Sequence, residues 1–191
     1  MLLTTPLSTP RLLLREFQED DWRATHPYEA NPEVVRYLSY SVRTPEESQD
    51  YIRMVMGMAR ETPRLVYDFA VVLREDNQLI GRCGMKVHDP ELREAMLWYV
   101  LNPAHWGKGY IPEAARALLD FAFGTLGLHR VFADCDPRNP ASVRVMEKLG
   151  MRQEAHFREN VFYKGEWCDS LIYAVLDREW RTRAKAPGHA G

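Results

Sequence analysis

Residues 102–115 read NPAHWGKGYIPEAA, and this stretch joins two apolar segments of different period. Before it, residues 95–101 (AMLWYVL) predict a central strand, which ends at Pro103 because proline has no N–H for the ladder of a sheet. After it, residues 112–123 carry apolar side chains on one helical face and predict an amphipathic helix. The chain therefore passes directly from a strand through a glycine turn into a helix.

The glycine turn has the composition of an anion site. Gly107 and Gly109 have no Cβ, so successive backbone N–H groups can converge on one anion. The start of the helix adds about half a positive charge, and Lys108 can add a full one. These features predict a pyrophosphate site, although a bare Gly-x-Gly is more often an ordinary tight turn, so the rest of the chain has to decide.

Two other glycine motifs do not match this turn. A dinucleotide fingerprint requires a third glycine at position 112, where the chain has Pro112. A P-loop requires Gly-Lys followed by Ser or Thr, and here Gly109 follows Lys108. Both motifs are excluded by spacing.

The other apolar runs complete a mixed pattern of helices and strands. Three pairs have the sequence of a helix N-terminus: Asn31–Pro32, Thr44–Glu47 and Asn139–Pro140. Further strands are expected at residues 11–17, 65–73, 79–87, 131–133, 153–163 and 168–176. The sequence therefore predicts an α/β protein, in the wider sense that includes α+β, with about seven strands.

A second informative segment, residues 136–151, reads DPRNPASVRVMEKLGM. Together with WGKGYIPEA it resembles the GNAT superfamily of acetyl-CoA-dependent N-acetyltransferases, more specifically its RimJ/RimL-like branch, which acetylates protein N-termini. The likeness spans nearly the whole chain, from STPRLLLRE at residues 8–16 to GEWCDSLIYAVLDREW at residues 165–180. Two separate motifs in the family's order argue against a chance resemblance.

The chain departs from the family's motifs at two positions. The first motif is usually Q/R-x-x-G-x-G/A, and here Trp106, Gly109 and Ile111 occupy its first, fourth and sixth positions. Ile111 is bulkier than the usual Ala or Gly and can narrow the approach to the phosphates. In the second motif Met151 replaces the usual Phe and can fill the same apolar volume.

The resemblance implies the GNAT fold, a mixed and strongly twisted sheet with helices on both faces, and acetyl-CoA as cosubstrate. It carries nine residues over as coenzyme-binding candidates: Leu101, Trp106, Gly107, Lys108, Gly109, Tyr110, Asn139, Arg144 and Lys148. Arg144 and Lys148 are assigned to the adenosine 3′-phosphate, and the alternative for both is ordinary helix surface.

Three residues are implied as catalytic. The Leu101 N–H is expected to polarise the thioester carbonyl. Ser142 is expected to protonate the leaving thiolate, and Asn139 to hold pantetheine or a water molecule. The alternatives are a solvated first-turn residue for Ser142 and a simple helix cap for Asn139. The general base is left open among carboxylates, with candidates Glu94, Asp136 and Glu159.

The acceptor is a primary amine, and its identity is left open. An α-amino group with a pKa near about 8 is partly neutral at physiological pH, whereas an alkylammonium with a pKa near about 10 is not. A protein N-terminus is favoured by resemblance to the branch, with Tyr28, Tyr37 and Tyr40 expected to wall its cleft. A small amine such as an antibiotic, a polyamine or an amino acid is the second hypothesis, and an acyl-CoA sensor without turnover is the third.

Length and charge limit the remaining possibilities. The 191 residues suit one domain, expected at residues 1–180, followed by a flexible polar tail at residues 181–191. Hydrophobic residues make up 46% of the chain, enough for a sizeable core. A net charge of −2 leaves no electrostatic footprint for nucleic acid. The sequence is compatible with a monomer or a homodimer.

Cysteines, histidines and apolar runs indicate the compartment. Cys83, Cys135 and Cys168 form no CxxC pair and the six histidines show no ligand spacing, so we expect neither a metal nor disulfides. No apolar run approaches the roughly 20 residues that cross a bilayer, so no membrane partner is expected. We therefore expect a protein of the reducing cytoplasm.

Overall fold

A computed structural model describes residues 5–184 of the chain. Its strands are β1 (Leu7–Ser8), β2 (Leu12–Arg15), β3 (Val66–Leu73), β4 (Leu79–Asp89), β5 (Glu94–Leu101), β6 (Arg130–Cys135), β7 (Arg152–Tyr163) and β8 (Glu166–Leu176). Its α-helices are α1 (Trp22–Glu29), α2 (Pro32–Val35), α3 (Pro45–Met58), α4 (Tyr110–Gly124), α5 (Pro140–Lys148) and α6 (Asp177–Ala184), with 3₁₀ turns at Glu19–Asp21 and Pro103–His105.

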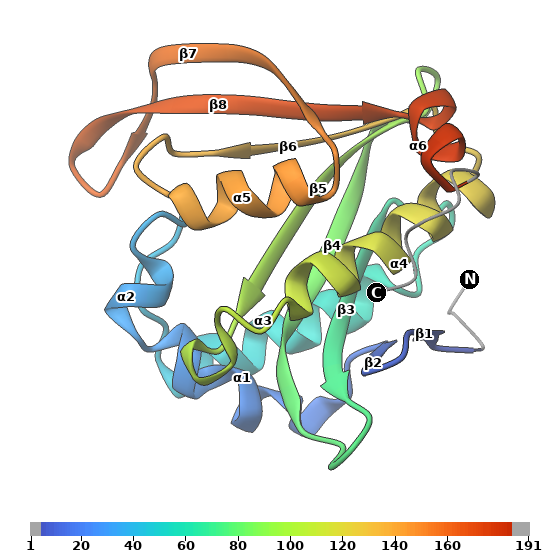
Figure 1. Cartoon of the computed structure of the whole chain (residues 1–191). Helices are drawn as coiled ribbons and strands as arrows, with labels where there is room; N and C mark the ends of the chain where they lie inside the picture. Colours follow the sequence, from blue (N-terminus) through green and yellow to red (C-terminus); the bar gives the residue numbers. More distant parts are fainter. Residues whose placement is uncertain (1–4, 185–191) are drawn as a thin grey trace.

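The strands form one mixed sheet in the order β1-β2-β3-β4-β5-β6-β8-β7 (Figure 1). Strands β5 and β6 pair in parallel, because α4 crosses over between them, and the other neighbouring pairs are antiparallel. The parallel register runs from Glu94 opposite Arg130 to Met96 opposite Phe132. Beyond Met96 the two strands part, and this divergence opens the middle of the sheet.

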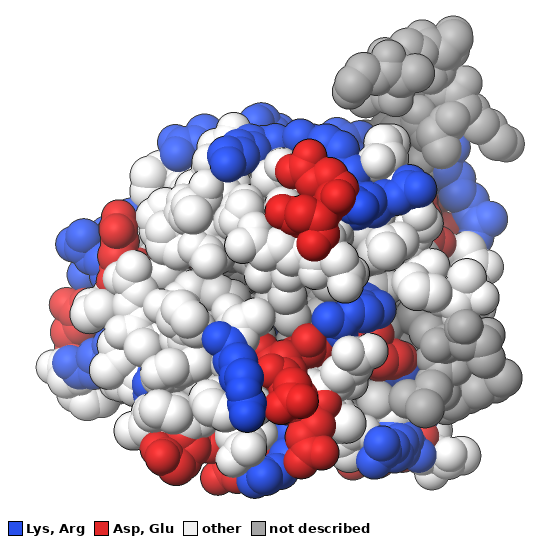
Figure 2. Space-filling model, turned by 90° about the horizontal axis from the view of Figure 1, so that it is seen from below, with Lys and Arg blue, Asp and Glu red and all other residues white. Residues whose placement is uncertain are grey.

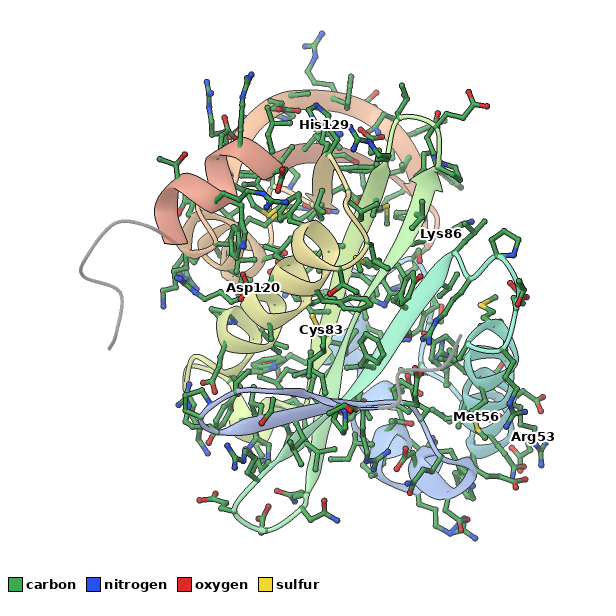
Figure 3. All side chains as sticks on the ribbon, turned by 90° about the vertical axis from the view of Figure 1, so that its right-hand side faces the viewer. Arg53, Met56, Cys83, Lys86, Asp120 and His129 are labelled. Atoms are coloured by element: carbon green, nitrogen blue, oxygen red, sulfur yellow. The ribbon has the colours of Figure 1, made fainter. Side chains whose placement is uncertain are left out.

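Helices cover both faces of the sheet (Figure 1). The larger core lies between the sheet and α4, where Leu118, Leu119 and Ala122 are fully buried. Cys83 points into this core and is likewise fully buried (Figure 3). The smaller core lies under α1 and α3, where Ile52 is fully buried. The mixed sheet with helices on both faces confirms the predicted fold class.

The predicted helix starts are present. The Thr44 side chain accepts from the Glu47 N–H and the Glu47 side chain accepts from the Thr44 N–H, which is the capping box expected for α3. Asn31 caps α2 and Asn139 caps α5, each with a proline at the first helical position. These short-range hydrogen bonds place the helices where the sequence indicated.

Three boundaries differ from the prediction. The sheet has eight strands in the described residues rather than about seven, because the two-residue strand β1 adds to the edge of β2. Helix α4 begins at Tyr110, two residues before the expected start. The expected tail begins inside α6, where Arg181 bonds Asp177 and the Phe123 carbonyl, so residues 181–184 are helical. The rest of the expected tail, residues 185–191, lies outside the described residues.

The surface carries both signs of charge. Figure 2 shows acidic and basic side chains interspersed over the face seen from below, in keeping with the small net charge of −2. In residues 5–184 no helix is long and apolar enough to span a membrane.

Candidate active site

The glycine turn has backbone angles that glycine adopts most readily. Gly107 and Gly109 adopt positive φ angles of 76° and 79°, which residues with a Cβ rarely adopt. Gly109 is the N-cap of α4 and supplies no side-chain cap. The first N–H groups of α4 therefore have no capping side chain, and the positive end of the helix faces the turn.

Leu101 lies where the sheet opens. The next residue, Asn102, donates its N–H to the carbonyl of Ile80 in β4 at 2.8 Å. Because N–H directions alternate along a strand, the Leu101 N–H points to the opposite edge, where β6 has already diverged. The Leu101 carbonyl accepts from Trp106 Nε1 at 2.9 Å. This end of β5 thus offers one backbone donor to the opening.

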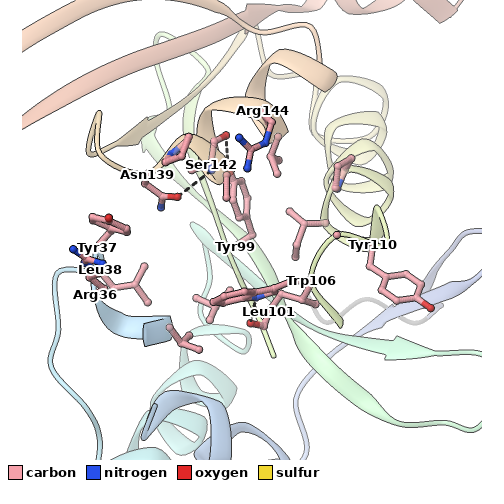
Figure 4. A pocket seen from close by; sticks show the side chains of 18 of the residues that line it. Arg36, Tyr37, Leu38, Tyr99, Leu101, Trp106, Tyr110, Asn139, Ser142 and Arg144 are labelled. Carbon is pink, nitrogen blue, oxygen red and sulfur yellow. Dashed lines mark hydrogen bonds between the residues drawn. The ribbon is translucent and has the colours of Figure 1, made fainter. Parts of the chain in front are cut away.

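A cavity of about 510 Å³ lies between the glycine turn, the end of β5 and the start of α5 (Figure 4). Eight of the nine coenzyme-binding candidates line it: Leu101, Trp106, Gly107, Gly109, Tyr110, Asn139, Arg144 and Lys148. Ser142 lines it as well. Residues that lie about 50 positions apart in the sequence are therefore brought to one cavity.

Lys108 differs from its neighbours. It is exposed and is not among the residues that line the cavity. Its backbone carbonyl is held by Arg11 NH1 at 3.0 Å. The expectation that the Lys108 ammonium adds charge to the cavity has no support in this arrangement.

Two hydroxyl groups meet in the cavity wall. Tyr99 on β5 places its hydroxyl 2.7 Å from Ser142 Oγ on α5 and 3.3 Å from the Ser142 carbonyl oxygen (Figure 4). Asn139 fixes the backbone beside them by accepting from the Ser142 N–H at 3.2 Å. Burial raises the pKa of Tyr99, and the hydrogen bond with Ser142 only partly offsets this. Tyr99 therefore keeps its proton and can donate it.

A second cavity, of about 230 Å³, lies on the other side of these hydroxyls. It is lined by the diverging parts of β5 and β6 and by the start of β8. Seven residues line both cavities: Arg36, Tyr37, Leu38, Tyr99, Arg138, Asn139 and Ser142. The two cavities therefore meet at the Tyr99 and Ser142 hydroxyls.

Sequence comparison assigns the family. Residues 11–152, more than half of the chain, match the family model described as the acetyltransferase (GNAT) domain. The chain belongs to the GNAT acetyltransferase family. The uncharacterized N-acetyltransferase YnaD of Bacillus subtilis is 37% identical over 174 residues, which cover 91% of this chain and 98% of YnaD. A crystal structure of a GNAT-family acetyltransferase from Bacillus anthracis matches with a TM-score of 0.83 at 35% identity, over 90% of this chain and 98% of that one.

More distant members have named acceptors. The spermidine N(1)-acetyltransferase of Vibrio cholerae is 26% identical over 92% of this chain and 98% of that protein. A structure of the Vibrio cholerae spermidine N-acetyltransferase with CoA and spermine has a TM-score of 0.78 at 22% identity, over 91% of this chain and 99% of that one. The ribosomal-protein-S5-alanine acetyltransferase of Vibrio fischeri has a TM-score of 0.78 at 20% identity, over 91% and 97%. These two structures share the fold with this GNAT enzyme, which is an acetyl-CoA-dependent N-acetyltransferase.

The sequence did not single out Asp134, which lines the second cavity of this GNAT enzyme. Its carboxylate is accessible to solvent, yet the surrounding protein removes part of its hydration and raises its pKa above the ordinary value. Asp134 lies on β6 opposite Ile172 of β8, just beyond the point where β5 and β6 part. The signal available in the sequence was one acidic residue within the otherwise apolar run VFADC at residues 131–135.

The three carboxylates considered from the sequence are less suited to act as the base. Glu94 pairs with Arg130 at the far end of β5. Asp136 pairs with Arg138 at 2.6 Å, and hydrogen bonds from that guanidinium hold its pKa below the ordinary value. Glu159 is exposed on β7. Asp136 lines the second cavity, but its ion pair makes it a weaker base.

Of the three tyrosines expected at the acceptor cleft, Tyr37 lines both cavities. Tyr28 is buried at 1% exposure and lines neither. Tyr40 also lies outside both linings, and its hydroxyl accepts from Arg82 at 3.0 Å. Of these three tyrosines, only Tyr37 therefore lies where an acceptor cleft was expected.

Side chains suited to metals do not cluster in residues 5–184, where no three His, Cys, Asp or Glu side chains gather. The three cysteines are free and buried. Burial, followed by the Asp134 charge, raises the pKa of Cys135 to about 11, so its thiolate is disfavoured.

Proposed function

We propose that this enzyme transfers the acetyl group of acetyl-CoA to a protein N-terminal α-amino group, as in the RimJ/RimL-like branch that it resembles. The meeting of the two cavities at Tyr99 and Ser142 carries the proposal, because a transfer between two substrates needs one site for each. Holding both reactants in place is worth up to about 7–11 kcal/mol of the barrier.

The larger cavity is the proposed coenzyme site. Backbone N–H groups of residues 107–110 would bind the diphosphate, and Arg144 with Lys148 would meet the 3′-phosphate. Asn139 would hold pantetheine or a water molecule. The Leu101 N–H would stabilise the negative charge that develops on the thioester oxygen.

Tyr99 and Ser142 together are the proposed acid. Ser142 would protonate the leaving thiolate, and Tyr99 would resupply that proton through the 2.7 Å contact. The raised pKa of Tyr99 supports this role, because a protonated phenol is available throughout the physiological range.

Asp134 is the proposed base. Its carboxylate carries no ion pair within residues 5–184 and lines the smaller cavity, on the acceptor side. The raised pKa brings it nearer to neutral pH, where a carboxylate accepts a proton from an ammonium more effectively. A water molecule can carry the proton between them.

A polyamine is the second candidate acceptor. The observation that favours it is the 26% identity to a spermidine N(1)-acetyltransferase over 92% of this chain. The Asp134 carboxylate in the acceptor cavity is also compatible with a cationic amine.

The test is thiol release from acetyl-CoA in the presence of free-amine peptides, their N-terminally blocked counterparts, and spermidine. We expect release with free-amine peptides and none with blocked ones. Thiol release with spermidine but with none of the peptides would contradict a protein N-terminus as the acceptor and favour a polyamine. Tight CoA binding without release for any amine would overturn catalysis and leave the sensor hypothesis.

The proposed enzyme works in the cytoplasm as a monomer or a homodimer. Three free, buried cysteines support a reducing compartment. Cell fractionation and light scattering test the two statements separately.

A further inference from the structure

The bend between β1 and β2 contacts the glycine turn through Arg11. Arg11 NH1 donates to the Lys108 carbonyl at 3.0 Å, and the guanidinium lies over the Tyr110 ring, 4.6 Å from its centroid. In Figure 4 the Tyr110 ring points away from the cavity. Arg11 therefore holds the turn on the side opposite the proposed coenzyme.

Arg11 is itself fixed by Glu113 in the first turn of α4. Arg11 Nε donates to Glu113 Oε2 at 2.6 Å, and the Arg11 backbone N–H donates to Oε1 at 3.0 Å. The Thr9 hydroxyl also donates to Oε1, at 2.6 Å. Burial raises the pKa of Glu113, but these hydrogen bonds outweigh it and leave the pKa below its ordinary value. Glu113 is thus ionised, and its carboxylate holds the Arg11 guanidinium in place.

The contact with the Lys108 carbonyl decides where the Gly109 N–H points. Both groups belong to one peptide plane, and in a trans peptide the carbonyl and the N–H point in opposite directions. With the carbonyl directed to Arg11, the N–H of Gly109 is directed away from Arg11, and Gly109 lines the larger cavity. A released carbonyl could turn its oxygen, which repels phosphate, towards the cavity instead.

Arg11 also balances a charge. Glu113 lies four residues after Gly109, and its carboxylate alone would repel a diphosphate at the start of α4. The Arg11–Glu113 contact at 2.6 Å neutralises it. The Arg11 guanidinium contacts Glu113 through two of its nitrogens, Nε and NH2. A two-point contact of this kind orders a loop better than a single-point ion pair on the surface does.

From these contacts we propose that Arg11 is a positioning residue that presets the glycine turn for the coenzyme diphosphate. The proposal rests on the function proposed above and concerns the diphosphate alone. It predicts that Arg11 affects donors that carry a diphosphate and spares donors that lack one.

The test compares acetyl-CoA with S-acetylpantetheine, which has neither diphosphate nor adenosine, in the wild type and Arg11→Met. We expect the Kd for CoA, measured by calorimetry, to rise by about tenfold, as for the loss of one charge-assisted contact. We expect kcat/KM with S-acetylpantetheine to stay within about twofold. Arg11→Lys should also bind CoA more weakly, because an ammonium lacks the fork that serves Glu113 and Lys108 together.

Arg74→Met is the matched control. Arg74 donates to the Thr9 carbonyl at 2.8 Å, so it secures the same N-terminal segment without touching the glycine turn. Its Kd for CoA should match that of the wild type. An unchanged Kd for CoA in Arg11→Met would overturn the positioning role. An equal fall in kcat/KM with acetyl-CoA and with S-acetylpantetheine would overturn it as well. Failure of the wild type to bind CoA would instead overturn the proposed coenzyme site.

Discussion

The Tyr99 hydroxyl lies 2.7 Å from Ser142 Oγ, although the two residues are 43 positions apart in the chain. Tyr99 projects from β5 and Ser142 from the first turn of α5, so the contact forms only when α5 packs beside the opened sheet. Both hydroxyls line both cavities. This pair is the point at which the proposed donor and acceptor sites connect.

Loss of either hydroxyl should slow the chemical step. Tyr99→Phe and Ser142→Ala should each lower kcat by about 10²-fold or more and leave the Kd for CoA near that of the wild type. The double variant should be no slower than the slower single variant, because the two hydroxyls act as one relay. Tyr173→Phe, whose hydroxyl bonds Gln153 instead, is the control. The relay would be contradicted if, in steady-state kinetics, the loss of kcat in the double variant equalled the product of the two single losses.

Asp134 should set the acidic limb of the pH dependence. A base acts when deprotonated, so kcat should fall as pH drops through the pKa of Asp134, which partial loss of hydration raises above the ordinary Asp value. Asp134→Asn should remove this limb and lower kcat by about 10²-fold or more. Asp136→Asn, which removes the carboxylate paired with Arg138, should keep the limb. A kcat profile with the limb intact in Asp134→Asn would exclude Asp134 as the base.

Gly109 should be required for coenzyme binding. Its φ of 79° is strained for a β-branched residue, at a cost of about 1–3 kcal/mol, and relief of that strain would move the N–H groups of the turn. Gly109→Val should therefore raise the Kd for CoA by about tenfold or more. Gly57→Val is the matched control, because Gly57 lies on α3 with an ordinary φ and a Cβ added there would meet open space. Equal Kd values in calorimetry would contradict the anion site.

The Arg43–Glu29 pair should stabilise the helical segment. Glu29 is fully buried, and its Oε1 lies 2.7 Å from Arg43 NH1. Arg43→Met should lower the free energy of unfolding by about 3–5 kcal/mol, because it leaves a buried carboxylate unpaired. Adding Glu29→Gln should recover part of the loss. The exposed Arg53, which pairs with Asp50, gives the control: Arg53→Met should cost at most about 1 kcal/mol in urea unfolding.

Much of the fold was predictable because its signals are local. Asn139 was expected to begin a helix, and it caps α5 by accepting a hydrogen bond from the Ser142 N–H. The edge strand β1 was missed, because two residues carry no periodic pattern. Helix α6 (Asp177–Ala184) was missed because its residues are mostly polar, and the bonds of Arg181 to Asp177 and to the Phe123 carbonyl depend on where this helix packs.

The candidate site also has a part that could be predicted from the sequence and a part that could not. Local sequence pointed to the glycine turn, and the family resemblance of a second short motif pointed to Asn139 and Ser142. It gave no ranking for Asp134 over Asp136, because their difference lies in partners: Arg138 pairs with Asp136, and none of the described residues pairs with Asp134. It also gave no sign that Lys108 would lie outside the cavity lining.

By itself the amino-acid sequence determined the starts of α2, α3 and α5, the glycine turn after β5 and the family of the protein, because these depend on residues close together in the chain. Only the tertiary structure decided that Tyr99 meets Ser142, that Asp134 faces the smaller cavity and that Arg11 holds the glycine turn. The physical reason is that these contacts depend on how β5, β6, α4 and α5 pack, which no local propensity encodes.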